Sequence, residues 1–273
     1  VSGEVCEVYT YNNNFVGLGF LNTNSKIIVR MLTTNQEEIN EEFFYQRILN
    51  AWKMRQNLQL ENNCRVVYSE ADYMPGLIID KYADTLVIQV LSLGMDKHKD
   101  WIVNSLVKIF NPKCIYERSD VPVRHKEGLE EFKGVLYGEF SPQVEIEENG
   151  IKLIVDIENG QKTGYFLDQK MNRKSLEQYV NGKTVLDCFS HTGGFALHAS
   201  KYGAKEIVAV DISEKACHDI TNNANLNDFN NIQVVCDDVF NYLRKEQNNQ
   251  KFDVIVLDPP AFTKSKDTIK KAY

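Results

Sequence analysis

The C-terminal half of the chain alternates short apolar runs with longer stretches of helical spacing. Four runs rich in β-branched residues predict four strands, at Thr184 to Leu186, Ile207 to Val210, Ile232 to Val235 and Val254 to Leu257. Such alternation is typical of a parallel sheet with helices on its faces. Acidic residues follow at the carboxyl ends of these strands, where open α/β sheets bind ligands: Asp187, Asp211, Asp238 and Asp258.

The first half of the chain has a less regular pattern, with several strands around few helices. Short strands are expected within residues 1–34, and a helix over residues 37–59 with Asn40 or its neighbours as its cap. The remaining predicted elements are strands at 65–68, 76–81, 85–91 and 114–118, a helix over 97–110, a hairpin over 144–157 that turns at Asn149-Gly150, and a helix over 168–179.

These patterns divide the chain into three predicted parts. Residues 1–34 form a small β unit that buries too little surface to stand alone, so we expect its first strands to be missing. Residues 37–140 are expected to be an independent α+β domain, and residues 141–273 carry the hairpin and then the α/β sheet. A chain of 273 residues is long enough for two or three domains.

Composition is that of an ordinary globular protein, with 43% apolar and 25% charged residues. No apolar run approaches the roughly 18 residues that a membrane helix needs, and the N-terminus lacks the pattern of a signal peptide. We therefore expect a cytoplasmic protein without a membrane partner. The six cysteines lack metal-ligand spacing, which indicates neither a disulfide framework nor a metal site.

The net charge of −7 argues against a uniformly basic coat for nucleic acid. A local groove can still be basic on an acidic protein. Two clusters fit either such a groove or a solvated surface: Arg118, Arg124, His125 and Lys126 in the middle, and Lys264, Lys266, Lys270 and Lys271 at the end.

The loop after the first of the four strands has the features of a cofactor loop. Gly193 and Gly194 allow a sharp turn and a close approach to a ligand, although Gly-Gly is also a common turn. The helix that follows points its N-terminal amides at that ligand. A dinucleotide-binding fold would have the motif G-x-G-x-x-G at this position, and this loop lacks it. Its Asp187 would also repel the pyrophosphate of a dinucleotide. An acidic loop suits a cationic cofactor, which predicts S-adenosylmethionine.

The other acidic residues have two readings each. Asp211 can accept both ribose hydroxyls of the cofactor and Asp238 can hold the adenine amino group, or each can simply cap a helix. The segment Asp258-Pro259-Pro260 can present a planar substrate, or it can be a rigid loop. The order and spacing of the four carboxylates favour the cofactor site.

The block from Gly160 to Arg173 is too polar for a simple core connection. One interpretation is a surface loop with Asp168 as a helix cap. The other is a segment that folds over the cofactor cleft, in which Phe166 stacks, Gln169 adds an amide and Arg173 reaches a carboxylate or phosphate.

Together these motifs resemble a known family. The strings SEADYMPGLIIDKYADTLVIQVLS, IYERSDVPVRHKEGL, KTGYFLDQKMNR, LDCFSHTGGFALHA and VIVLDPPAF are similar to the bacterial 23S ribosomal RNA large-subunit methyltransferase I family, which makes 5-methylcytidine. The resemblance spans nearly the whole chain. It implies a class I, Rossmann-like methyltransferase sheet, preceded by a central α+β domain and the last strands of a PUA-like RNA-binding domain. It also implies 23S ribosomal RNA as a partner and the ability to form a homodimer.

The resemblance also assigns roles to residues. It implies that five residues surround the methionine part of S-adenosylmethionine: Asp187, Phe189, Ser190, Gly193 and Gly194. Asp211 would bind the ribose and Asp238 the adenine region. Asp258, Pro259 and Pro260 would form the mouth where the base arrives.

Methylation at carbon 5 of cytosine needs a thiolate that adds to carbon 6. Asp258 would help by hydrogen bonding to the N3 and amino edge of the base. In the resembling family the nucleophilic cysteine follows the Asp-Pro-Pro segment, so we expect it beyond Tyr273 and expect this chain alone to be inactive. Cys188 is expected to pack in the core instead.

Two alternatives remain open at this point. Asp-Pro-Pro followed by an aromatic residue is also used to methylate exocyclic amines, although Ala261 separates Pro260 from Phe262 here. The other alternative is an RNA-binding or nucleotide-binding module without catalysis.

Overall fold

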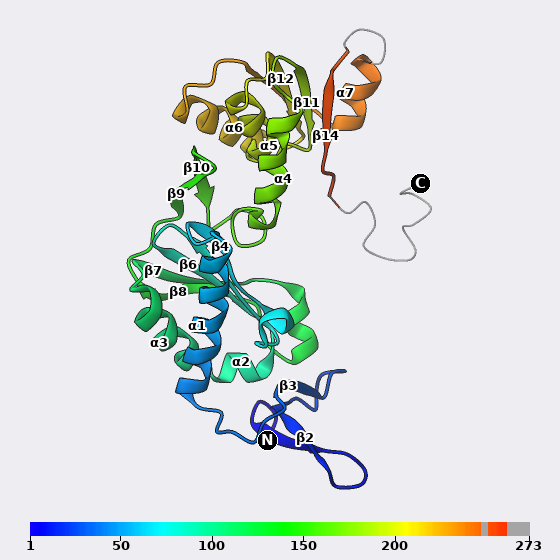
Figure 1. The fold of residues 1–273 in the computed structure, drawn as a ribbon. Helices are drawn as coiled ribbons and strands as arrows, with labels where there is room; N and C mark the ends of the chain where they lie inside the picture. The colour runs from blue at the N-terminus through cyan, green and yellow to red at the C-terminus, as the bar shows by residue number, and fades with distance from the viewer. Residues whose placement is uncertain (247–250, 261–273) are drawn as a thin grey trace. The chain divides into compact units, whose positions relative to one another are not determined.

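The computed structural model describes residues 1–246 and 251–260, apart from the side chain of residue 246. These residues belong to two compact units (Figure 1). The first unit comprises Val1–Ile146 and Val155–Asp168, and the second comprises Glu147–Ile154 and Gln169–Tyr273. The segment 1–34 thus falls in the same unit as the central segment, and the division into three domains stays a prediction. The basic cluster Lys264, Lys266, Lys270 and Lys271 lies outside the described residues.

The first unit contains two sheets. Its elements are β1 (Val5–Tyr9), β2 (Phe15–Leu21), β3 (Val29–Thr33), α1 (Glu41–Asn57), β4 (Asn63–Tyr68), η1 (Ser69–Asp72), β5 (Leu77–Tyr82), β6 (Thr85–Val90), α2 (Leu93–Lys97), α3 (Lys99–Phe110), β7 (Cys114–Ser119), η2 (Pro122–Glu127) and β8 (Phe132–Gly138). Strands β1, β2 and β3 form an antiparallel sheet in that order. The larger sheet has the order β4-β5-β6-β7-β8, and only its β6–β7 pair is parallel.

Helix α1 connects the two sheets of the first unit through one shared core. The Asn40 side chain accepts a hydrogen bond from the Phe43 amide at 3.1 Å, which confirms Asn40 as the predicted cap and begins the helix at Glu41. Phe44 is fully buried, and its ring centroid lies 6.5 Å from that of Phe20 on β2. Phe20 and Leu32, from residues 1–34, therefore pack in the same core as the central segment.

Strand β8 was not predicted, and its position explains why. It is the edge strand of the five-stranded sheet, paired with β7 alone. Phe132, Val135 and Tyr137 are all more than a third exposed, so the strand carries no buried alternation that a sequence pattern would display.

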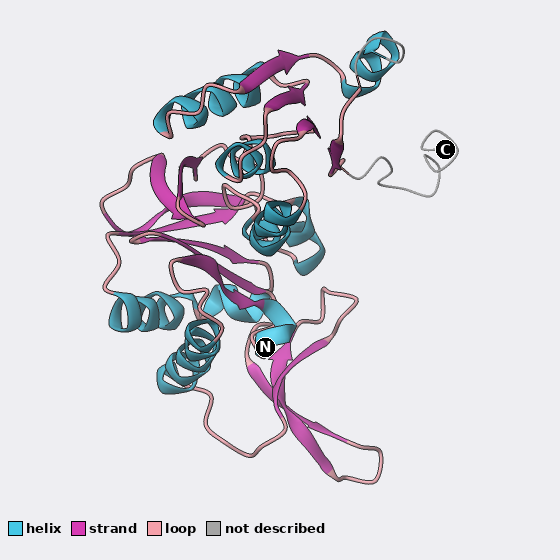
Figure 2. Cartoon of the chain, turned by 45° about the horizontal axis from the view of Figure 1, so that its top comes forward, coloured by secondary structure: helices cyan, strands magenta, loops and turns pink. Residues whose placement is uncertain are grey.

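The second unit is built around a parallel sheet (Figure 2). Its elements are α4 (Lys170–Ser175), η4 (Leu176–Gln178), β11 (Thr184–Cys188), α5 (Gly194–Lys201), β12 (Glu206–Asp211), α6 (Glu214–Leu226), β13 (Ile232–Cys236), α7 (Val239–Glu246) and β14 (Val254–Leu257). The strand order is β13-β12-β11-β14, and every pair is parallel. All four predicted strands are confirmed, and so is the α/β fold class.

Alternate residues along these strands face opposite layers of helices. Val185 and Ile207 pack in a core with residues of α5 and α6, including Ala196 and Ile220. The intervening positions, such as Leu186, join a second core with residues of α7. A strand that is buried on both faces reads as a continuous apolar run, which is why these runs were recognisable in the sequence.

The predicted hairpin is present, but it is divided between the two units and does not belong to the second alone. It consists of β9 (Gln143–Glu148) and β10 (Ile151–Asp156), and its turn has positive φ at Asn149 (50°) and Gly150 (74°). The helix predicted over 168–179 is present as an uninterrupted run of helical turns, of which only α4 is α-helical: a 3₁₀ turn, η3 (Leu167–Gln169), precedes α4, and η4 follows it. Short 3₁₀ turns are common at the ends of α-helices.

Within the described residues, no helix is both long and apolar enough to cross a membrane.

Candidate cofactor site

The parallel strands bring three of the predicted carboxylates to one edge of the sheet. Asp187 is the fourth residue of β11, Asp211 ends β12, and Asp258 directly follows β14. In the register, Cys188 pairs with Val210 on one side and with Leu257 on the other, so Asp211 and Asp258 flank the end of β11. The negative charges of Asp211 and Asp258 both act on Asp187.

Asp187 is the buried centre of this edge, with 1% of its surface exposed. Its Oδ2 atom accepts hydrogen bonds from Ser190 Oγ at 2.5 Å and from the Ala196 amide at 3.1 Å. Burial, together with the negative charges of Asp211 and Asp258, raises the pKa of Asp187 to about 7, although these two hydrogen bonds lower it. An uncompensated carboxylate of this kind would be stabilised by a cationic ligand.

The loop after β11 has an unusual backbone. Phe189 and His191 have φ values of 60° and 55°, and Gly193 has a φ of 86°. Non-glycine residues rarely adopt such angles, and strained loops cluster at ligand sites. Gly193 is also close to Ile220, whose Cγ2 atom would lie 3.2 Å from an added Cβ. The loop leads into the N-terminus of α5, which begins at Gly194.

Asp211 and Asp238 have different surroundings. Asp211 Oδ2 accepts a hydrogen bond from the His191 amide and Oδ1 accepts one from the Ser213 amide, both at 2.9 Å, so this carboxylate ties the β11 loop to the end of β12. Asp238 Oδ1 accepts a hydrogen bond from the Asn241 amide at 2.9 Å, which is a capping contact at the start of α7.

The structure brings Gln169 to Asp258. Gln169 Nε2 donates to Asp258 Oδ2 at 3.3 Å, and Gln169 Oε1 accepts from Asn172 Nδ2 at 2.6 Å. Asp258 is exposed, and Pro259 and Pro260 follow it without regular structure. This pair presents an amide and a carboxylate to solvent at the end of β14.

Two other predicted residues have partners within their own units. Phe166 belongs to the first unit, where the Lys162 ammonium lies 4.3 Å from its ring centroid. Arg173 is only 2% exposed, and its Nε and Nη2 atoms lie 2.6 and 2.9 Å from the Oε1 and Oε2 atoms of Glu148. The Arg173 guanidinium therefore does reach a carboxylate, but one that belongs to the protein.

Glu148 and His198 were missed by sequence reasoning. Glu148 is buried at the end of β9 and holds Arg173, while His198 Nδ1 lies 2.7 Å from the Gly194 carbonyl oxygen. Burial lowers the pKa of His198 to about 4, although the nearby Glu148 opposes this shift. The sequence did contain one indication that Glu148 is buried. Side chains alternate along a strand, so Glu148 lies on the same inward face of the hairpin as Ile146.

Cys188 packs in the core, as predicted. It is fully buried, and burial raises the pKa of its thiol to about 11. Within residues 1–246 and 251–260, no group of three or more His, Cys, Asp and Glu side chains is arranged to hold a metal ion. The expected nucleophile beyond Tyr273 lies outside the described residues.

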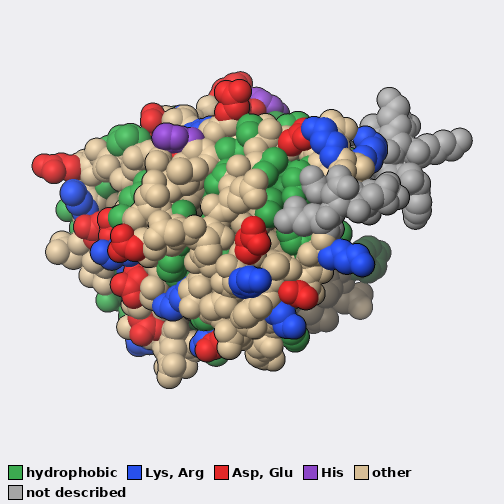
Figure 3. Space-filling view, turned by 90° about the horizontal axis from the view of Figure 1, so that it is seen from above, with side chains coloured by type: hydrophobic (Ala, Val, Ile, Leu, Met, Phe, Trp, Pro, Cys, Tyr) green, Lys and Arg blue, Asp and Glu red, His purple; other side chains and the backbone are tan. Residues whose placement is uncertain are grey.

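The middle basic cluster is divided between two buried arginines and the exposed residues His125 and Lys126. Arg118 and Arg124 are only 7% and 3% exposed, and their guanidinium groups pair with Asp120 and Asp96. On the face shown in Figure 3, acidic and basic side chains are interspersed and do not form one basic patch.

Comparison with known proteins agrees with this geometry. Residues 120–273 match the family model described as S-adenosylmethionine-dependent methyltransferase, and residues 1–34 match a PUA-like domain. The chain is 45% identical to ribosomal RNA large subunit methyltransferase I of Aeromonas salmonicida, over 97% of this chain and 69% of that protein. The protein of the same name from Aliivibrio fischeri is 42% identical, over 99% and 70% of the two chains.

Solved structures support the same relationship. A methyltransferase, SMU.776, complexed with SAH has a TM-score of 0.84 and 26% identity, covering 98% of this chain and 70% of that one. A SAM-dependent methyltransferase from Streptococcus mutans has a TM-score of 0.82 and 27% identity, covering 99% and 73%. The chain therefore belongs to the family of ribosomal RNA large subunit methyltransferase I, within the S-adenosylmethionine-dependent methyltransferases.

Proposed function

We propose that this methyltransferase acts on carbon 5 of a cytosine in 23S ribosomal RNA. The substrate is suggested by the names of the relatives and by the PUA-like match at residues 1–34. A ribosomal substrate would locate the protein in the cytoplasm. The observation that carries the assignment of the site is the set of carboxylates around the strained loop after β11.

The chemistry of this edge fits S-adenosylmethionine. Its sulfonium and amino groups are cationic, and Asp187 is a buried carboxyl whose ionisation is opposed by burial and by two further carboxylates. When bound, the cofactor would supply the methyl group. We propose that Asp187, Phe189, Ser190, Gly193 and Gly194 surround its methionine part.

The remaining cofactor contacts follow from the strand order. Asp211 would accept the ribose hydroxyls, and Asp238 would lie beside the adenine. Phe166 and Arg173, which the sequence predicts to lie at the cofactor, are proposed as further cofactor-binding residues. Arg173 would be held in place by its ion pair with Glu148.

At the substrate side, Asp258 and Gln169 would receive the base. The Gln169 amide orients the Asp258 carboxylate through the hydrogen bond to Oδ2, and the carboxylate would then accept a hydrogen bond from the exocyclic amino group of cytosine. Pro259 and Pro260 would keep this segment rigid because proline restricts φ. Cys188 is not the thiolate that carbon-5 chemistry needs, because it is buried and its pKa is raised to about 11.

Binding calorimetry with S-adenosylmethionine tests the cofactor site. We expect Asp211→Asn to weaken binding at least tenfold, which corresponds to about 1.4 kcal/mol. A matched control is Asp253→Asn, because the Asp253 carboxylate accepts hydrogen bonds from Thr184 at the opposite end of the same sheet. Equal affinity for wild type and Asp211→Asn would contradict the assignment.

Methyl transfer tests the substrate. The full-length protein that carries this sequence should transfer labelled methyl groups to unmodified 23S ribosomal RNA, and nucleoside analysis should find 5-methylcytidine. Methylation of an exocyclic amine is the second candidate, favoured by the hydrogen-bonding pair Asp258 and Gln169 at the end of β14. An N-methylated nucleoside in the product would establish that alternative and refute carbon 5.

A further inference from the structure

Two exposed tyrosines flank the short turn between β4 and β5. Tyr68 ends β4 and is 53% exposed, and Tyr73 follows η1 and is 66% exposed. Aromatic side chains carry a large apolar surface, so two of them in solvent at one turn form a feature that protein folding alone does not favour.

The backbone of this turn is strained. Ser69 has a φ of 47°, and Tyr73 has a φ of 59° with a ψ of 29°, which is the left-handed region. A bulky residue is an outlier there, whereas glycine adopts the region freely. Strain of this kind persists where surrounding contacts hold it, and it is concentrated at functional sites.

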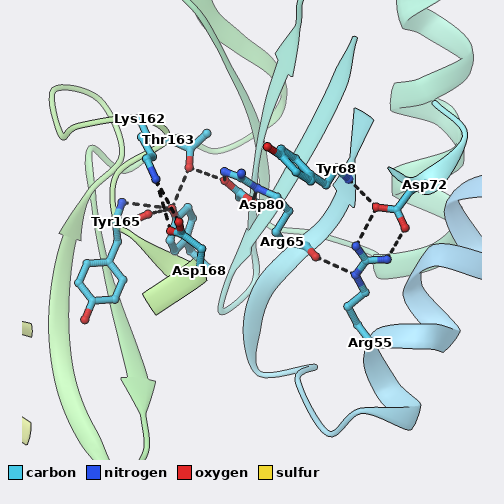
Figure 4. A network of polar contacts seen from close by, with 10 residues as sticks. Arg55, Arg65, Tyr68, Asp72, Asp80, Lys162, Thr163, Tyr165 and Asp168 are labelled. Atoms are coloured by element: carbon cyan, nitrogen blue, oxygen red, sulfur yellow. Dashed lines mark hydrogen bonds and ion pairs between the residues drawn. The ribbon is translucent and has the colours of Figure 1, made fainter. Parts of the chain in front are cut away.

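A buried ion pair holds the turn in this conformation (Figure 4). Arg55 Nη1 and Nη2 lie 2.5 and 2.7 Å from the two carboxylate oxygens of Asp72, and both side chains are at most 10% exposed. Asp72 Oδ2 also accepts a hydrogen bond from the Tyr68 amide at 2.6 Å. Met74, which directly follows Tyr73, is fully buried. The two tyrosines are therefore presented from a rigid turn.

Each tyrosine ring lies beside an arginine. The guanidinium carbon of Arg65 is 5.2 Å from the Tyr68 ring centroid, and that of Arg47 is 5.3 Å from the Tyr73 centroid. Arg65 is fixed by Asp80, at 2.8 and 2.9 Å (Figure 4). Aromatic rings combined with guanidinium planes are the surfaces on which proteins stack unpaired bases.

The charges near the turn decide which part of a nucleic acid would be bound. Glu70, within the turn, has a 64% exposed side chain, and its Oε1 atom lies 3.3 Å from Arg30 Nη1. A hollow of about 460 Å³ beside Arg47 is lined in part by the carboxylates of Glu37, Glu38 and Glu42. These groups repel phosphates, so the surface suits the uncharged faces of bases and not the backbone.

We propose that Tyr68 and Tyr73 form a stacking surface for unpaired bases of the RNA substrate, separate from the residues proposed for methyl transfer. This inference rests on the proposed function, because it requires that the protein binds RNA. The strained turn keeps a tyrosine where glycine would be more stable, since the aromatic ring binds the base.

The substitution Tyr73→Gly separates this role from a structural one. Glycine relieves the strain at a φ of 59°, so the thermal midpoint should stay the same or rise. The affinity for a labelled single-stranded RNA of about 12 nucleotides, measured by fluorescence anisotropy, should fall about tenfold. The loss should be equal at low and high salt, because no phosphate contact is removed. Tyr73→Phe should retain the wild-type affinity.

A control and two further outcomes complete the test. Tyr179→Gly removes another tyrosine that is 60% exposed and should leave RNA affinity unchanged. If wild type binds the RNA and Tyr73→Gly binds it equally well, the stacking surface is refuted while the proposed RNA substrate stands. If wild type binds S-adenosylmethionine but no RNA, both the stacking surface and the proposed substrate fail.

Discussion

At the scale of single residues, the buried carboxyl of Asp187 should make stability depend on pH. Its pKa of about 7 in the folded protein lies above its ordinary value of 3.8, so the folded state holds an extra proton between these values. Stability from this group is complete below about pH 4 and is lost as the pH rises through about 7. Asp187→Asn keeps the shape but cannot ionise, so wild type should lose stability relative to this variant across that range.

Urea unfolding of both proteins between pH 4 and pH 8 measures this difference. The comparison is needed because His198, whose pKa is lowered to about 4, contributes in the opposite direction as the pH falls from its ordinary value. Both proteins contain His198, so its contribution cancels when the free energy of unfolding of one is subtracted from that of the other at each pH. If this difference in the free energy of unfolding is the same from pH 4 to pH 8, Asp187 is ionised in the folded state throughout that range.

The same group predicts a proton released on cofactor binding. A cationic ligand beside Asp187 should lower its pKa from about 7, so binding near neutral pH should expel part of a proton. Calorimetry in two buffers of different ionisation enthalpy measures the number of protons exchanged. Wild type should release more protons than Asp187→Asn. If both proteins release the same number of protons, the bound cofactor does not change the pKa of Asp187.

At the scale of elements, the hairpin end and α4 should depend on the pair between Glu148 and Arg173. Both side chains are almost fully buried, and their two contacts of 2.6 and 2.9 Å are bidentate. Glu148→Gln removes the negative charge that faces this buried guanidinium, and breaking a buried ion pair typically destabilises a protein by about 3–5 kcal/mol. Denaturant unfolding measures the loss. Glu145→Gln on the same strand is exposed, so this control should stay within about 0.5 kcal/mol of wild type.

Elements that face a core on both sides were predictable, and those that depend on distant partners were not. The strands β11 to β14 display continuous apolar runs because α5 and α6 cover one face and α7 covers the other. The edge strand β8 has no such pattern, and the partner that buries Arg173 is Glu148, 25 positions away. Local periodicity carries no information about that partner.

In the candidate site, the residues could be predicted from the sequence, but the contacts between them could not. A carboxylate directly after a β-branched run can be recognised in the sequence, so Asp187, Asp211 and Asp258 could be predicted. The hydrogen bond from the His191 amide to Asp211 could not, since it depends on a left-handed residue 20 positions earlier in the chain. The contact of Gln169 with Asp258 spans 89 positions.

At the scale of the whole molecule, cofactor binding should stabilise the two units unequally. The residues proposed to bind S-adenosylmethionine, except Phe166, belong to the second unit. A ligand at one hundred times its dissociation constant stabilises the state that binds it by about 2.7 kcal/mol. Hydrogen exchange with S-adenosylhomocysteine should therefore slow amides in the loops after β11 and β12 and in α5, and leave β1 to β3 nearly unchanged. Asp211→Asn at the same ligand concentration should show little protection, and slowing confined to the first unit would mean that the cofactor binds elsewhere.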